Sequence, residues 1–337
     1  MTATITLSQA KSLIRAMAHE QSLLLLSAPG VGKSDIVHQA AAEANLPCRS
    51  LLGTQIAPED VSGVPRIVGD RSVFCPPRLL LPENAEPFCL FLDELPAGAP
   101  DVQKAFYSLL LERRIGEFPL PPGSWVVAAG NRMEDRALVR AMSSALVNRV
   151  LIAHIEVDRK EWLMWAKADG VRPEILAFIT YMPAALMRPV PRDPVPFSTP
   201  RAWAALSRAF DLVERQGLLS TEHRRALAFG RVSAEDAALF CALAEEKLAE
   251  LLPIEQYLAD PGKLPPADTA RWFIIHQLRH LIQRRELPAV PPEQINRFLS
   301  EIPSEFRFAV MVDLVEQWAE LGASEAMLAA LREVTGV

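Results

Sequence analysis

A short apolar stretch that leads directly into a loop of small residues and lysine places the strongest constraint on this fold. Residues 22–27 read SLLLLS, a run typical of a strand buried on both faces of a parallel sheet. Residues 27–34 read SAPGVGKS, the spacing GxxxxGK[ST] with serine at the first glycine position. Helical periodicity follows over residues 34–45. A strand, such a loop and a helix in succession predict an α/β fold with a phosphate-binding loop.

The residues of this loop indicate how phosphate would be bound. Gly30 and Gly32 let the backbone curl so that successive N–H groups face one concavity, and the helix adds its N-terminal partial charge. Lys33 would reach the β- and γ-phosphates of a nucleotide, and Ser34 would offer its hydroxyl to Mg²⁺. The predicted binding residues are Ala28, Pro29, Gly30, Val31, Gly32, Lys33, Ser34 and Asp35.

Two further apolar runs end in polar side chains that suit hydrolysis. The run FCLFL at residues 88–92 is followed by Asp93 and Glu94, sixty residues after Lys33. Asp93 would hold Mg²⁺ through water, and Glu94 would polarise the attacking water. The next run, WVVAA at residues 125–129, leads to Asn131, whose amide would hydrogen-bond the water or the γ-phosphate, or would support a turn.

The remaining periodicity divides the chain into an α/β part and a helical part. Further strands are predicted at 48–52 and 150–155, helices at 7–19 and 101–113, and a hairpin at 65–75 around Gly69 and Asp70. Beyond residue 157 the pattern is helical, at 159–168, 173–181, 201–215, 233–250, 267–285, 292–300 and 304–333. Six prolines in residues 183–200 predict a packed connector between helices. We therefore expect an α/β core at 1–157 with a parallel sheet covered by helices on both faces. A helical lid would follow at 158–215, and a helical region without an assigned role at 216–337.

In this order, the motifs resemble those of the AAA+ ATPases, and more closely the MoxR-like branch of the dynein-related group. The resemblance covers about residues 5–210 and rests on Ser27–Ser34, on Leu90–Glu94 with the following LPAGAPDVQKAF, on WVVAAGN, on ALVNR at 145–149 and on STPRAW at 198–203. It implies a P-loop NTPase that uses ATP and Mg²⁺ and assembles into a ring, usually a hexamer. It also implies a protein client, in this branch often one with a von Willebrand factor A domain.

The resemblance implies catalytic roles for two arginines. Arg149 falls at the position of the arginine finger, which reaches the γ-phosphate bound to a neighbouring subunit. Arg136 and Arg140 lie nearby and are rivals for that role. Arg201 falls at the sensor 2 position and would contact the γ-phosphate in its own subunit. The segments 65–75 and 114–123 correspond to inserts that face the ring pore or a partner, or they are simply structure at the sheet edge.

The composition argues against several classes of function and location. The 35 basic and 41 acidic residues give a net charge of −6, which argues against general nucleic-acid binding. The four cysteines form no CxxC pair, no apolar stretch reaches membrane-spanning length, and the N-terminus lacks the pattern of a signal peptide, so we expect a cytoplasmic protein.

The leading hypothesis is therefore an ATP-hydrolysing MoxR-type protein that remodels a protein client. One alternative is an AAA+ motor or loader that acts on nucleic acid, which the acidic balance disfavours. The other is a nucleotide-gated assembly scaffold with little turnover, which the pair Asp93 and Glu94 disfavours together with Asn131.

Overall fold

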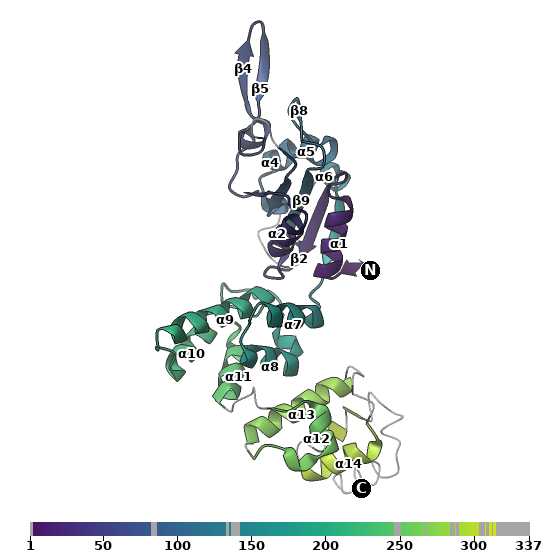
Figure 1. Ribbon diagram of the computed structural model, residues 1–337, viewed down its shortest axis with the longest axis vertical. Helices are drawn as coiled ribbons and strands as arrows, with labels where there is room; N and C mark the ends of the chain where they lie inside the picture. The colour runs from purple at the N-terminus through teal and green to yellow at the C-terminus, as the bar shows by residue number, and fades with distance from the viewer. Residues whose placement is uncertain are drawn as a thin grey trace. The chain divides into compact units, whose positions relative to one another are not determined.

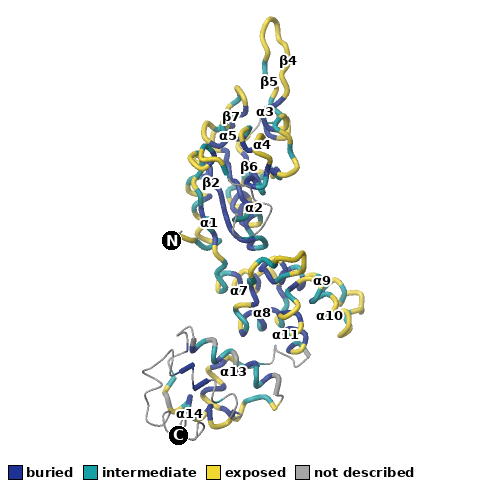
Figure 2. The backbone as a smooth tube through the Cα atoms, turned by 180° about the vertical axis from the view of Figure 1, so that it is seen from behind, coloured by how far each residue is buried: buried dark blue, intermediate teal, exposed yellow. Residues whose placement is uncertain are grey.

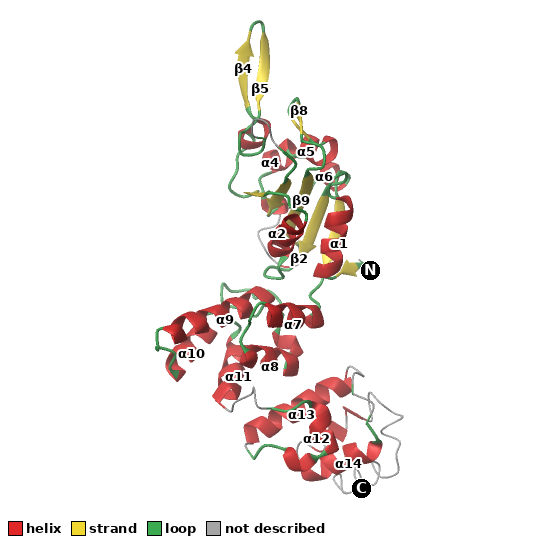
Figure 3. Ribbon diagram, viewed as in Figure 1, coloured by secondary structure: helices red, strands yellow, loops and turns green. Residues whose placement is uncertain are grey.

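The computed structural model divides the chain into two compact units (Figures 1 and 3). The first comprises Met1–Trp165 and Met187–Ala204, and the second Ala166–Leu186 and Ala205–Val337. The structure describes residues 3–81, 86–132, 135, 142–245, 251–266, 268–283, 287, 290–302, 307, 310–311 and 313–314.

The first unit is built on a six-stranded sheet whose paired neighbours are all parallel. The order is β1 (Thr4–Ile5), β10 (Leu151–Ile155), β2 (Leu23–Ser27), β9 (Trp125–Asn131), β6 (Cys89–Asp93) and β3 (Cys48–Leu52). Because the strands are parallel, the carboxyl ends of the neighbours β2, β9 and β6 lie along one edge of the sheet. The predicted parallel sheet is confirmed.

Helices cover both faces of this sheet. Alternate residues of β2 enter two different hydrophobic clusters, because successive strand side chains point to opposite faces. Leu23 and Leu25 pack with α1 (Leu7–Met17) and α2 (Lys33–Glu43), whereas Leu24 and Leu26 pack with α4 (Pro100–Ala105) and α5 (Tyr107–Glu112). The helix predicted at 101–113 is present as two helices, because α4 ends at Ala105 and α5 begins at Tyr107. Between them, Phe106 N–H donates to Gln103 O at 3.3 Å, the i→i−3 pattern of a tightened last turn.

Two short hairpins extend from this unit. The strands β4 (Val64–Val68) and β5 (Arg71–Cys75) pair antiparallel around Gly69 and Asp70, which confirms the predicted hairpin. Both strands are mostly exposed, as the yellow tube in Figure 2 shows. In the predicted insert at 114–123, β7 (Arg114–Ile115) pairs with β8 (Phe118–Pro119). The elements α3 (Glu59–Ser62), η1 (Leu95–Ala97) and α6 (Ser144–Val147) complete the unit.

Every regular element described in the second unit is helical. Its helices are α8 (Pro173–Tyr181), η3 (Pro183–Ala185), α10 (Thr221–Phe229), α11 (Ala234–Glu245), α12 (Ile254–Ala259), η5 (Pro261–Lys263), α13 (Asp268–Gln283) and α14 (Pro292–Glu301). Helices α7 (Arg159–Ala168) and α9 (Pro200–Arg215) contribute residues to both units.

Helices α10 and α12 were not predicted, and most of the helix predicted at 304–333 lies outside the described residues. None of the helices in the described ranges is long and apolar enough to cross a bilayer.

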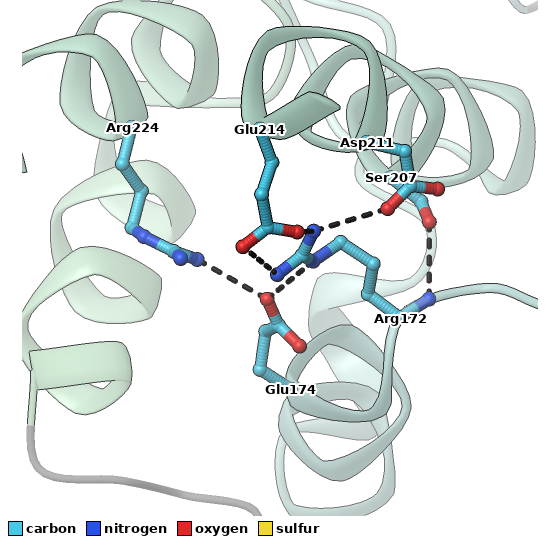
Figure 4. A network of polar contacts seen from close by, with 6 residues as sticks. All are labelled: Arg172, Glu174, Ser207, Asp211, Glu214 and Arg224. Atoms are coloured by element: carbon cyan, nitrogen blue, oxygen red, sulfur yellow. Dashed lines mark hydrogen bonds and ion pairs between the residues drawn. The ribbon is translucent and has the colours of Figure 1, made fainter. Parts of the chain in front are cut away.

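An ionic network joins α8, α9 and α10 of the second unit (Figure 4). The Arg172 guanidinium, 14% exposed, donates to Glu174 at 2.6 Å, to Asp211 at 3.0 Å and to Glu214 at 2.6 Å. Arg224 donates to the same Glu174 oxygen at 3.2 Å. The backbone N–H of Arg172 donates to Ser207 Oγ at 3.0 Å. One half-buried arginine thus connects the start of α8 to the last turns of α9, and Glu174 connects α8 to α10.

Removing this guanidinium leaves three carboxylates close together without their common partner. We expect Arg172→Met to lower the free energy of unfolding of the second unit by about 1–3 kcal/mol. This is less than for a fully buried ion pair, because the carboxylates are partly exposed to solvent. Chemical denaturation followed by circular dichroism measures the loss. Arg208→Met is the matched control, because Arg208 is 61% exposed and lies 3.9 Å from Asp169; we expect a change below roughly 0.5 kcal/mol. Equal losses in the two variants would contradict the assigned role of Arg172.

The network also predicts sensitivity to acid. Hydrogen bonds from Arg172 hold the pKa of Glu214 below its ordinary value of 4.5. Burial raises the pKa of Glu174, but hydrogen bonds from the backbone and from Arg172 outweigh it, so this pKa is also lowered. Both carboxylates therefore stabilise the fold fully above the ordinary pKa, and this stability is lost as the pH falls through their lower pKa values in the folded protein. Between about pH 6 and about pH 3, the unfolding midpoint should fall more steeply in the wild type than in Arg172→Met. If the unfolding midpoints of the two proteins fall equally steeply with pH, the carboxylates do not act through Arg172.

Candidate nucleotide-binding site

The Lys33 ammonium lies at the centre of the candidate site. Strand β2 ends at Ser27, the loop turns through Gly30 and Gly32 with φ of 79° and 114°, and α2 begins at Lys33. Lys33 Nζ lies 3.0 Å from Ser27 Oγ, 3.2 Å from Ala28 O and 3.0 Å from Asn131 Oδ1. Burial lowers the pKa of Lys33 to about 8, an effect that the charge of Asp93 opposes and that of Arg201 reinforces. The amine is therefore mostly protonated at neutral pH and suited to an anionic ligand.

Other residues of the loop shape its concavity. Ala28 and Val31 are buried and pack into the cluster beneath α1 and α2, which fixes the loop to the core. Pro29 is half-buried, and Asp35 lies exposed in the first turn of α2.

The two residues predicted to hold Mg²⁺ contact each other. Ser34 Oγ donates to Asp93 Oδ2 at 2.8 Å, which joins the start of α2 to the end of β6. A hydroxyl and a carboxylate at this distance are oxygen ligands of the kind that Mg²⁺ prefers. The residues present therefore fit the expected metal ion.

Glu94 has an unusual backbone conformation at the end of β6. Its φ of 54° and ψ of 31° fall in the left-handed region, which is uncommon for residues other than glycine. Its N–H donates to Asp93 Oδ1 at 3.0 Å, and its carboxylate accepts from Thr54 Oγ1 at 3.1 Å. Gly53 N donates to Asp93 O at 2.8 Å, so the turn after β3 is fixed against the turn after β6. Such strained residues are concentrated at functional sites.

Thr54 was missed by the sequence analysis. It follows β3, which pairs with β6 in register, and this adjacency lets its hydroxyl reach Glu94. In the sequence, Thr54 can be recognised only as a polar residue just past the end of a predicted strand.

Asn131 reaches Lys33 because of strand register. Ser27 at the end of β2 pairs with Asn131 at the end of β9, so both side chains contact the same ammonium. Gly130 precedes Asn131, and a Cβ there would lie 2.4 Å from Pro96 Cδ. The strand carrying Asn131 therefore packs tightly against the segment that follows Glu94.

Arg201 is brought to the loop by a segment far away in sequence. Its backbone N–H donates to Gly30 O at 3.0 Å, and Ser198 and Thr199 just before it are buried. The Arg201 guanidinium forms no ion pair within the part of the chain that the structure describes. Its charge lies close enough to Lys33 to lower the pKa of that lysine.

Arg149 lies elsewhere in the first unit. Its Nη1 donates to Ala145 O at 2.7 Å, and its guanidinium lies 4.8 Å from the centre of the Tyr107 ring. The Tyr107 hydroxyl in turn contacts Ser143 Oγ at 2.5 Å. The rival residues Arg136 and Arg140 lie outside the described residues. The structure thus brings together Lys33, Ser34, Asp93, Glu94, Asn131 and Arg201, whereas Arg149 packs against α5.

One family model matches the part of the chain that contains the β2 loop, β6 and β9. Residues 22–159 match the family described as AAA domain (dynein-related subfamily). No curated protein matches the sequence.

Among solved structures, the RuvB Holliday junction branch migration motor of Thermotoga maritima is 15% identical over 96% of this chain and 86% of its own, with a TM-score of 0.41. NtrX from Brucella abortus is 13% identical over 99% and 69%, with a TM-score of 0.40. A candidate ATPase from Cytophaga hutchinsonii is 16% identical over 73% and 89%, with a TM-score of 0.37. The family match and the parallel sheet with its loop show that the first unit has the fold of an AAA+ P-loop NTPase.

Proposed function

We propose that this protein hydrolyses ATP to ADP and phosphate in the presence of Mg²⁺, and that a ring of its subunits uses the reaction to remodel a protein client. The observation that carries the hydrolytic part is the contact of Ser34 with Asp93 beside the contact of Lys33 with Asn131. Side chains from the ends of β6 and β9 thereby meet the start of α2, directly after the phosphate-binding loop. The match of residues 22–159 to an AAA domain supports the same proposal.

The proposed roles follow from the chemistry of each side chain. Lys33 balances charge on the β- and γ-phosphates, and Ser34 and Asp93 hold Mg²⁺, which when bound neutralises charge on phosphate oxygens. Glu94 accepts a hydrogen bond from the attacking water and polarises it, once its carboxylate leaves Thr54. Asn131 orients that water or the γ-phosphate, and Arg201 contacts the γ-phosphate.

The proposal of a client rests on resemblance and on one surface. In the MoxR-like branch, the client is often a protein with a von Willebrand factor A domain. The β4–β5 hairpin exposes four large apolar side chains: Val64 is 64% exposed, Ile67 81%, Val68 49% and Phe74 43%. Apolar side chains clustered at a protruding hairpin suit contact with another protein. We place the protein in the cytoplasm; none of its four cysteines forms a disulfide bond in the structure.

Glu94→Gln is the first test of hydrolysis. The amide keeps the size of the side chain but cannot act as a base, so we expect kcat to fall by at least about a hundredfold while ATP still binds. Phosphate release measures turnover, and a fluorescent ATP analogue measures binding. Glu20→Gln is the matched control, because the Glu20 side chain is 80% exposed, and it should leave both unchanged. Equal turnover in Glu94→Gln and wild type would refute the assigned role.

A second prediction tests catalysis between subunits. Arg149→Ala should lower turnover by roughly a hundredfold or more, because the finger acts on a neighbour. A mixed assembly of Arg149→Ala with Glu94→Gln subunits should recover up to about a quarter of wild-type turnover, because one in four interfaces then joins an intact site to an intact finger. Subunits co-assembled before the assay provide the measurement. No recovery would rule out Arg149 as the finger, and the same mixing with Arg136→Ala and Arg140→Ala would test the two rivals.

A further inference from the structure

The tip of the phosphate-binding loop packs against the start of α9, within the first unit. A Cβ added at Gly30 would lie 2.5 Å from Thr199 Oγ1 and 2.7 Å from Thr199 Cβ. Such distances are below any real Cβ contact, so the Gly30 backbone and the Thr199 side chain are in tight contact. Thr199 is only 5% exposed. Gly30 therefore cannot move toward the start of α9 unless Thr199 moves as well.

Thr199 also caps the helix that carries Arg201. Its Oγ1 accepts from Ala202 N, the third residue of α9, at 3.1 Å, and its carbonyl accepts from Trp203 N at 3.0 Å. This is the geometry of an N-cap. Pro200 occupies the first helical position, where no N–H is required. Arg201 lies in this first turn, which frays when a cap is lost.

Two hydrogen bonds anchor the segment on either side of Thr199. Arg201 N donates to Gly30 O at 3.0 Å, and Arg188 N donates to Ser198 O at 2.9 Å. Thr199 is thus held between the loop and the helix by its own hydroxyl and by its neighbours' backbone. The Thr199 hydroxyl that accepts from Ala202 N is also the side-chain atom nearest to the Cβ position of Gly30, with Cβ and the methyl group next to it.

We propose that Thr199 is a positioning residue for Arg201: by capping α9 while it packs on Gly30, it fixes the first turn of α9 to the phosphate-binding loop. Arg201 then approaches a bound γ-phosphate in one orientation. The inference rests on the proposed hydrolysis of ATP and on the role of Arg201 in it. It assigns to Thr199 a function that its sequence position alone does not indicate.

The competing explanation is that Thr199 only stabilises the fold. A purely structural residue would lower turnover equally whether or not Arg201 is present. A residue that acts through Arg201 should lose its effect when Arg201 is gone. A double-mutant cycle on kcat therefore separates the two.

The cycle compares the full-length wild type with Thr199→Val, Arg201→Ala and the double variant, and Thr199→Ser serves as the conservative control. Valine keeps the packing on Gly30 but removes the acceptor for Ala202 N, so we expect kcat to fall roughly fivefold, the size of one lost cap. KM should change less than about twofold, because Lys33 and Ser34 are untouched. Serine keeps the hydroxyl and should retain kcat. Binding of a fluorescent ATP analogue confirms that each variant is folded.

The proposal predicts that Thr199→Val has no further effect on kcat in the Arg201→Ala background. A fivefold loss in both backgrounds, or an equal loss in Thr199→Ser, would overturn it. If Thr199→Val does not bind the analogue, Thr199→Ser in the otherwise wild-type protein decides: kcat equal to that of the wild type supports a role of the hydroxyl, and a reduced kcat overturns it. Absence of turnover in the wild type would instead overturn the proposed function, and unchanged kcat in Arg201→Ala would overturn the role of Arg201.

Discussion

The arrangement of the site depends on the buried charge of Lys33, which the surrounding residues must stabilise. An ammonium group removed from water must be surrounded by acceptors or by negative charge. Ser27 at the end of β2 and Asn131 at the end of β9 supply acceptors, and Asp93 at the end of β6 supplies charge. The parallel order β2-β9-β6 makes this convergence possible, because the carboxyl ends of neighbouring strands meet at one edge. The same convergence places a buried cation at the start of α2, where a helix N-terminus favours a phosphate.

Close packing of backbone on the neighbouring turns makes this arrangement rigid. Gly53 lies against the turn after β6, and Gly130 lies against Pro96. Glu94 is held in a left-handed conformation between these contacts and accepts from Thr54. The carboxylate that we propose as the base is therefore oriented by its backbone and by a neighbouring strand, and it can move once the hydrogen bond from Thr54 breaks.

The sequence predicts those parts of the site in which local pattern is sufficient. The strand, loop and helix around Lys33 are contiguous, and Asp93 and Asn131 each follow an apolar run. Thr54 and Thr199 could not be predicted, because their contacts depend on the pairing of β3 with β6 and on packing of a segment about 170 residues after Gly30. The helix at 101–113 was predicted as continuous because its apolar spacing persists across Phe106, the one residue that separates α4 from α5. Helix α10 is short, and its signal, the Ser220 cap, resembles an ordinary turn.

The most direct test of this account is the rate of phosphate release from Mg·ATP per subunit, measured over a wide range of protein concentration. If each site needs an arginine from a neighbouring subunit, as we propose, the rate per subunit is low in dilute protein, rises as subunits associate, and disappears when Mg²⁺ is chelated. No phosphate release above background at any concentration would contradict the central claim that the residues around Lys33 form a hydrolytic site.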